Sequence, residues 1–183
     1  MINEIFENAK QRMNKAIEHC SKEMSQIRTG RASTSLLDNI KVDYYGTLTP
    51  LNNIAHISTP DPQLIVIQPF DPTSLELIEK TIISSDLGLN PNNDGNVIRL
   101  NIPALTEERR KELIKVVHGY AENGKVSIRN IRRDMNDQLK KEKENNLSED
   151  NYKRALDNIQ ELTNESVDTI DEILKDKEKD ILS

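Results

Sequence analysis

Aromatic residues and cysteine are scarce in this sequence. Its 183 residues include no Trp, two Phe, four Tyr and a single Cys. So few aromatic rings argue against a surface on which successive unpaired bases stack. One cysteine excludes an internal disulfide and is typical of a protein that works in a reducing compartment, so we expect a cytoplasmic location.

Long apolar runs are also missing. No stretch approaches the ~20 consecutive apolar residues that span a membrane. The N-terminal segment, MINEIFENAKQRMNK, follows the pattern of an amphipathic helix and lacks the uninterrupted apolar core of a signal peptide. We therefore expect no association with a membrane.

Residues that carry catalysis or bind metals do not gather into a recognisable motif. His19, His56 and His118 lie in different segments, without the spacing of metal ligands. Cys20 falls on an apolar helix face, where a buried structural thiol is expected. Neither a P-loop nor a dinucleotide-binding glycine motif is present. The sequence thus predicts a protein that is not an enzyme and that needs no metal or cofactor.

Three segments show the spacing of apolar residues that is typical of long helices. The second starts after Thr106 and the third after Ser148, and both residues are suitable N-caps followed by acids. The apolar positions are Ile2, Phe6, Ala9, Met13, Ala16, Cys20, Met24 and Ile27 in the first segment, Leu113, Val117, Tyr120, Ile128, Ile131, Met135 and Leu139 in the second, and Tyr152, Ala155, Ile159, Leu162, Val167, Ile170 and Leu174 in the third. Gly124 shares the apolar face of the second helix, which predicts either a close approach between helices or a local weakness.

The segment between the first two helices has a different composition, because all seven prolines lie between residues 50 and 103. Its pattern is that of a small α/β unit. In chain order, the expected elements are an alternating strand at 40–44, a turn at 45–46, a buried strand at 64–67, a helix over 73–84, a turn at 90–96 and a strand at 97–102.

The order of these elements predicts an α+β protein. We expect residues 1–30 and 105–183 to form a long three-helix bundle domain, and residues 31–104 to form an inserted small α/β domain. The chain then crosses between the domains twice. Two crossings make a hinge that bends but does not rotate as freely as a single linker.

Charge is unevenly distributed along the chain. The net charge is −6, yet residues 105–143 hold eleven Lys and Arg against seven Asp and Glu. The cations of the second helix cluster away from its apolar face over ~48 Å, with Glu122 as the one acid near the middle. This basic stripe consists of Lys111, Lys115, His118, Lys125, Arg129, Arg132, Arg133, Lys140 and Lys143.

Two interpretations of the basic stripe remain open. A stripe of this length suits a phosphate backbone, to which arginines offer forked pairs of donors. With few aromatics, such a surface would recognise folded RNA by its shape and backbone, and Asn130 would be placed to reach a base edge or a 2′-hydroxyl. Alternatively, the stripe is a solvated face whose charges pair with acids of the third helix, as suits Lys140 and Lys143.

Five motifs resemble the ribosome recycling factor family of bacteria and organelles. They are IRTGRAS (27–33), YYGTLTPL (44–51), SDLGLNPNNDGNVIRL (85–100), LTEERRKEL (105–113) and IRNIRRDMND (128–137). The resemblance covers essentially the whole chain. It implies an L-shaped protein in which a three-helix bundle adjoins a small β/α/β domain.

The same resemblance implies a function. Members of the family bind the post-termination ribosome at large-subunit RNA of the intersubunit face. Together with elongation factor G they promote subunit splitting, and they perform no covalent chemistry. We expect a monomer that binds neither DNA nor a membrane. The RNA-binding residues that the motifs imply are Arg28, Arg31, Arg110, Arg129, Asn130, Arg132 and Arg133.

Two other classes of function compete with this one. A protein-binding adaptor would engage a partner through an exposed apolar patch, and its binding would be insensitive to RNase. An enzyme would need titratable groups that converge in a cleft, and the sequence offers no obvious set.

Overall fold

The computed structural model describes all 183 residues, and the chain divides into two compact units. The first, here called the bundle unit, comprises Met1–Arg28 and Thr106–Ser183. The second, the sheet unit, comprises Thr29–Leu105. The chain therefore passes between the units twice, after Arg28 and after Leu105.

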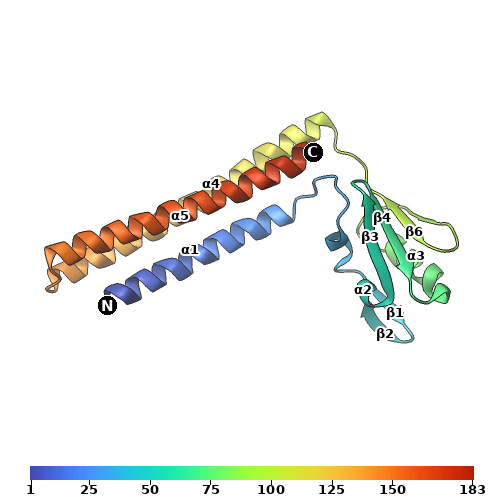
Figure 1. Cartoon of the computed structure of the whole chain (residues 1–183), viewed down its shortest axis with the longest axis horizontal. Coiled ribbons are helices and arrows are strands. Elements are labelled where there is room, and N and C mark those ends of the chain that lie inside the picture. Colours follow the sequence, from blue (N-terminus) through green and yellow to red (C-terminus); the bar gives the residue numbers. More distant parts are fainter. The chain divides into compact units, whose positions relative to one another are not determined.

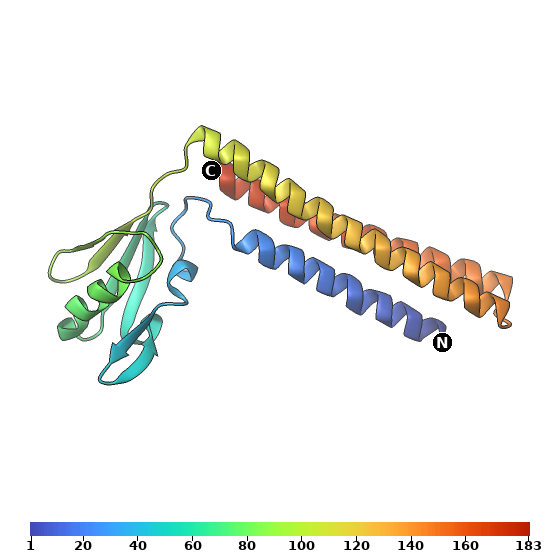
Figure 2. The same cartoon turned by 180° about the vertical axis from the view of Figure 1, so that it is seen from behind.

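Three long helices form the bundle unit. They are α1 (Ile2–Ser25), α4 (Glu107–Glu144) and α5 (Glu149–Leu182), which lie side by side and contact one another in every pair (Figures 1 and 2). The predicted N-caps are confirmed: the Thr106 hydroxyl accepts a hydrogen bond from the Arg109 amide at 3.2 Å, and the Ser148 hydroxyl accepts one from the Asn151 amide at 3.3 Å. None of the helices is long and apolar enough to cross a membrane.

The bundle core lies on the predicted apolar faces, but several predicted positions are only half-buried, among them Phe6, Leu162 and Val167. Tyr120 is only half-buried, and its neighbour Ala121 occupies the core instead. Thr163 and Ser166 of α5 are also buried, although both are polar. Their hydroxyls find acceptors, because Thr163 donates to the carbonyl of Ile159 at 2.7 Å and Ser166 donates to the Met13 sulfur at 3.5 Å. A satisfied hydroxyl can occupy a core position at little cost.

Gly124 marks a close approach between the three helices. A Cβ at this position would lie 3.0 Å from Cδ1 of Ile170 and 3.3 Å from Sγ of Cys20. Cys20 itself is buried, donates to the Tyr120 carbonyl at 3.6 Å, and has its pKa raised by burial. Of the two predictions for Gly124, a close approach between helices is therefore correct. The prediction that Cys20 is a buried structural thiol is also confirmed.

A four-stranded antiparallel sheet organises the sheet unit. Its strands, in the order β3-β4-β6-β5, are β3 (Ala55–Asp61), β4 (Leu64–Pro69), β6 (Ile98–Asn101) and β5 (Pro91–Asn93). A separate hairpin pairs β1 (Lys41–Tyr44) with β2 (Thr47–Pro50). Its turn is the predicted one, and Tyr45 and Gly46 both have positive φ, 50° and 83°, as a tight two-residue hairpin requires.

The core of the sheet unit lies on one face of the sheet. Ile65 and Ile67 of β4 and Ile98 and Leu100 of β6 are fully buried there. The helix α3 (Leu75–Ile83), which follows a 3-10 turn at Pro72–Ser74, contributes to the same cluster, as do the short helix α2 (Leu51–Ile54) and a 3-10 turn at Thr34–Leu37. The predicted fold class, a long helical bundle with a small α/β unit, is confirmed.

One predicted turn is wrong in part, and two strands were not predicted. Pro91–Asn93, expected within a turn, forms the edge strand β5, where the missing N–H of proline is tolerated. The turn itself is shorter and is held by Asp94, whose carboxylate accepts hydrogen bonds from the amides of Val97 and Asn96 at 2.9 Å. These bonds, with that of the Arg99 side chain, lower the pKa of Asp94 to about 2. The two unpredicted strands are β2 and β3.

The two helical glycines are expected to respond oppositely to substitution. A Cβ at Gly119 meets no atom within 4 Å, so Gly119→Ala should raise the free energy of unfolding by ~1 kcal/mol through helix propensity alone. Gly124→Leu forces a side chain between α1 and α5 and should lower it by ~1–3 kcal/mol. Urea unfolding followed by circular dichroism measures both. A Gly124→Leu protein as stable as the parent would contradict the close packing described above.

Candidate nucleic-acid interface

The basic stripe of α4 contains cations in two different electrostatic situations. One group pairs with acids of α5. Lys125 pairs with Asp171, His118 with Glu178, and Lys143 with Glu149 at 2.7 Å. The second interpretation of the stripe is thus correct for these three positions, although Lys140, for which pairing was also considered, forms no ion pair.

The pair at the connection between α4 and α5 is the most elaborate. The Lys143 ammonium lies 2.7 Å from the Glu149 carboxylate and 4.9 Å from the centre of the Tyr152 ring. The hydrogen bond between the two charges raises the pKa of Lys143 and lowers that of Glu149. These contacts join the C-terminal end of α4 to the N-terminal end of α5. A ligand phosphate would have to compete with Glu149 for the Lys143 ammonium.

The arginine cluster in the middle of α4, defined as Arg129, Arg132 and Arg133, is in the other situation. Arg133 is exposed and forms no ion pair. Arg132 donates from Nη1 to the amide oxygen Oε1 of Gln160 on α5, at 3.3 Å, and so meets a neutral group. Only Arg129 meets an acid, Glu122 of its own helix at 3.1 Å, and both side chains are about half exposed (44% and 58%).

Helix geometry sets the directions of these side chains. At about 100° per residue, Arg129 and Arg133 point within ~40° of one another, and Arg132 lies ~60° from Arg129 on the side of α5. Asn130 is exposed ~60° beyond Arg133 on the other side. The four residues therefore form one outward surface, with three forked cations and one amide. Such a set can bind several phosphates and one polar edge.

The other predicted RNA-binding residues lie elsewhere. Arg110 is on α4, ~28 Å from Arg129 along the helix axis. It is half-buried, and its Nε atom is buried without a hydrogen-bond partner. Arg28 is exposed in the bundle unit after the end of α1, and Arg31 is exposed in the sheet unit. The structure thus brings together four of the seven predicted residues.

Gln160, which contacts Arg132, was not predicted from the sequence. A Gln on an exposed helix surface carries no motif. Its one signal is its place in α5, on the flank that also carries Asp171 and Glu178, the acids that pair with α4.

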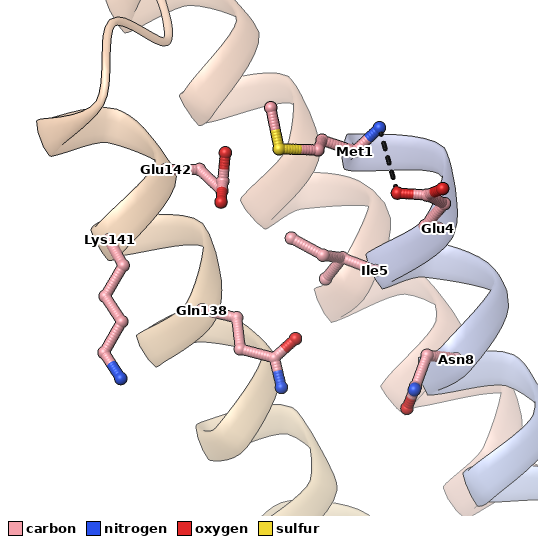
Figure 3. Close-up of a pocket in the computed structure, with 7 residues that line it drawn as sticks. All are labelled: Met1, Glu4, Ile5, Asn8, Gln138, Lys141 and Glu142. Atoms are coloured by element: carbon pink, nitrogen blue, oxygen red, sulfur yellow. Dashed lines mark ion pairs between the residues drawn. The ribbon is translucent and has the colours of Figure 1, made fainter.

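A hollow at the far end of the bundle does not form a comparable site. About 330 Å³ of space lies between the N-terminal turn of α1 and the last turns of α4 (Figure 3). The Met1 amino group is 3.3 Å from the Glu4 carboxylate there, and Ile5, Asn8, Gln138, Lys141 and Glu142 complete the lining. The ion pair is local to the first turn of α1, and the remaining polar groups do not converge. The structure also holds no group of three or more His, Cys, Asp or Glu arranged to bind a metal.

Comparison with known proteins identifies the family. A model of the ribosome recycling factor family matches residues 20–182. The chain belongs to the ribosome recycling factor family. Similarity extends over the whole length of curated relatives: the ribosome-recycling factor of Halothermothrix orenii is 56% identical over 100% of this chain and 99% of its own, and that of Bacillus pumilus is 51% identical over the same shares. The resemblance drawn from the five motifs is confirmed.

Solved structures of the family share this fold. A solution structure of the ribosome recycling factor has a TM-score of 0.78 and 42% identity, with 99% of this chain and 97% of the other covered. A second, the T. thermophilus ribosome recycling factor placed with E. coli elongation factor G on the E. coli post-termination complex, has a TM-score of 0.66 and 47% identity over both full chains. The fold and the family thus agree.

Proposed function

We propose that this protein is a translation factor that binds the post-termination ribosome and, with elongation factor G, splits it into subunits and releases it from messenger RNA. Its affinity would come from the bundle unit docking on large-subunit RNA at the intersubunit face. The observation that carries the proposal is the arginine cluster, in which Arg133 forms no ion pair and Arg132 meets a neutral amide, on a helix where Lys125 and Lys143 pair with acids of α5. A relative with 47% identity has been placed on a post-termination complex, which supports the choice of target.

The physical basis of docking is electrostatic and geometric. Each arginine that neutralises a phosphate releases condensed counterions, which favours binding at low salt. A rigid helix fixes the spacing of the cluster, so the surface matches RNA of one shape better than a flexible basic tail would. The scarcity of exposed aromatic rings in the bundle unit agrees with recognition of backbone and shape. Within this surface, Asn130 supplies a donor and an acceptor for a base edge or a 2′-hydroxyl.

Three further residues have subsidiary roles in the proposal. Arg28 and Arg31 flank the first crossing between the units and would add phosphate contacts there. Arg110 is the weakest candidate, because half of its side chain is already inside the protein. The protein would act as a monomer in the cytoplasm, without cofactor and without covalent chemistry.

The sheet unit has the second role in the mechanism. We infer that it receives the action of elongation factor G and passes it to the bundle unit through the two chain crossings. The bundle unit would then move against the RNA and open the subunit interface. A pair of cysteines introduced on either side of the crossings, in the Cys20→Ser background, tests this step. Oxidation should slow splitting and leave ribosome binding intact, and full-rate splitting by the cross-linked protein would exclude relative motion of the units.

Arg132→Ala should weaken binding to vacant ribosomes by about ten- to a hundredfold at ~0.1 M salt, because one charge-assisted contact is worth ~1.5–3 kcal/mol. The slope of log K against log salt should also fall by about one. Co-sedimentation across a salt series measures both quantities. Arg12→Ala is the matched control, since Arg12 is 41% exposed on α1 and pairs with Asp134 at 2.7 Å on another side of α4. It should change ribosome affinity little.

Two results would contradict the proposal. Equal losses for Arg132→Ala and Arg12→Ala would mean that net charge and not the cluster determines binding. Unchanged binding by folded Arg132→Ala would remove the cluster from the interface. If, in addition, partner capture survived RNase, the protein-binding adaptor would become the better account.

A further inference from the structure

On the flank of α5 that faces the basic stripe, three acids contact α4 at some levels, and two amides stand at others. Glu149 and Asp171 each pair with a lysine of α4, and Glu178 contacts His118. At the level of the arginine cluster the chain places Gln160 and Asn164 instead. The change in chemistry coincides with the part of α4 where free charge is needed.

The two amides form a directed chain of hydrogen bonds. Nε2 of Gln160 donates to Oδ1 of Asn164 at 2.9 Å, one helical turn along α5. The amide oxygen of Gln160 is thereby turned toward α4, where it accepts from Nη1 of Arg132 at 3.3 Å. A reversed amide would set two donor groups against each other. Arg132, which can only donate, and Asn164, which accepts from the other end, together hold the Gln160 amide in this orientation.

We propose that Gln160 is a positioning residue that holds Arg132 in place for RNA without neutralising its charge, and that Asn164 helps to fix the orientation of the Gln160 amide. This inference rests on the proposed function. A neutral acceptor occupies one of the five donors of the guanidinium and restrains the side chain, so fewer rotamers are lost on binding. The remaining donors and the full positive charge stay available to a phosphate.

A carboxylate at position 160 would have the opposite effect. It would pair with Arg132 as Asp171 pairs with Lys125, and a phosphate would have to displace it. The neutral side chains at positions 160 and 164 also differ from those on the neighbouring outer face of α5. It carries five exposed acids, at intervals of three and four residues, over the same stretch of the helix: Asp157, Glu161, Glu165, Asp168 and Glu172. Gln160 and Asn164 therefore separate the arginine cluster from a continuous acidic face.

Gln160→Glu tests the inference, with Gln11→Glu as the matched control. Both substitutions replace an exposed Gln by Glu on a helix of the bundle unit and change the net charge equally. In co-sedimentation of the full chain with vacant ribosomes at ~0.1 M salt, Gln160→Glu should bind about three- to tenfold more weakly, and the loss should shrink as salt rises. Gln11→Glu should stay within about twofold of the parent.

Thermal unfolding separates this role from a structural one. Gln160→Glu gains an ion pair with Arg132 and a repulsion from Asp157, and both effects are small, so its Tm should stay within a few degrees of the parent value. A further comparison uses the Arg132→Ala background, where Gln160→Glu should cost no more than Gln11→Glu does. A loss of affinity without a loss of stability, present only when Arg132 is present, is the expected result.

The outcomes distinguish this inference from the proposed function. If Arg132→Ala weakens binding and Gln160→Glu does so no more than Gln11→Glu, the role of Gln160 is wrong and the interface stands. If Gln160→Glu is equally harmful without Arg132, it acts by general repulsion and the positioning role is again wrong. If Arg132→Ala itself has no effect, the interface fails and this inference fails with it.

Discussion

The packing of α4 between α1 and α5 is the constraint on which the rest of the bundle depends. The buried face of α4 runs from Leu113 to Leu139, and at Gly124 the helices approach so closely that Cys20 and Ile170 would touch a side chain placed there. Such a contact fixes the rotation of α4 about its own axis, because any turn would drive polar residues into the core. Once the rotation is fixed, the direction of every cation on the helix follows. The packing of the core therefore sets the direction of the arginine cluster before any RNA binds.

The rotation of α4 also determines which of its cations face α5 and which face outward. Cations of α4 that face α5 meet acids and are neutralised, which holds two helices together and contributes little to binding a polyanion. Among the cations that face outward, Arg133 and Lys140 form no ion pair. Arg132 lies at the boundary, close enough to α5 to be held and yet paired with an amide in place of an acid. A protein with a net charge of −6 can in this way carry one surface suited to RNA, because local charge rather than total charge determines which phosphates approach.

The sequence predicted the long helices well because their apolar spacing continues over many turns and because Thr106 and Ser148 are clear N-caps for α4 and α5. It failed where the signal was short. Pro91–Asn93 forms an edge strand that only pairing with β6 reveals, and Ala121 rather than Tyr120 occupies the core. The arginines of α4 were recognisable from type and spacing. Their pairing was not, since Gln160, Asp171 and Glu178 are ordinary surface residues until the register of α5 against α4 is known. The contribution of Arg28, Arg31 and Arg110 to binding stays a prediction.

In the function proposed above, the outward face of α4 contacts ribosomal RNA and the outer face of α5 does not. A photo-activatable amino acid at position 126 tests it directly, because Val126 is 43% exposed and lies one and two turns before Asn130 and Arg133. The same probe at position 161, in the acidic face of α5, is the comparison. On vacant ribosomes, the account predicts cross-links from position 126 to large-subunit RNA and few or none from position 161. Equal cross-linking from both positions, or RNA captured only from position 161, would contradict it.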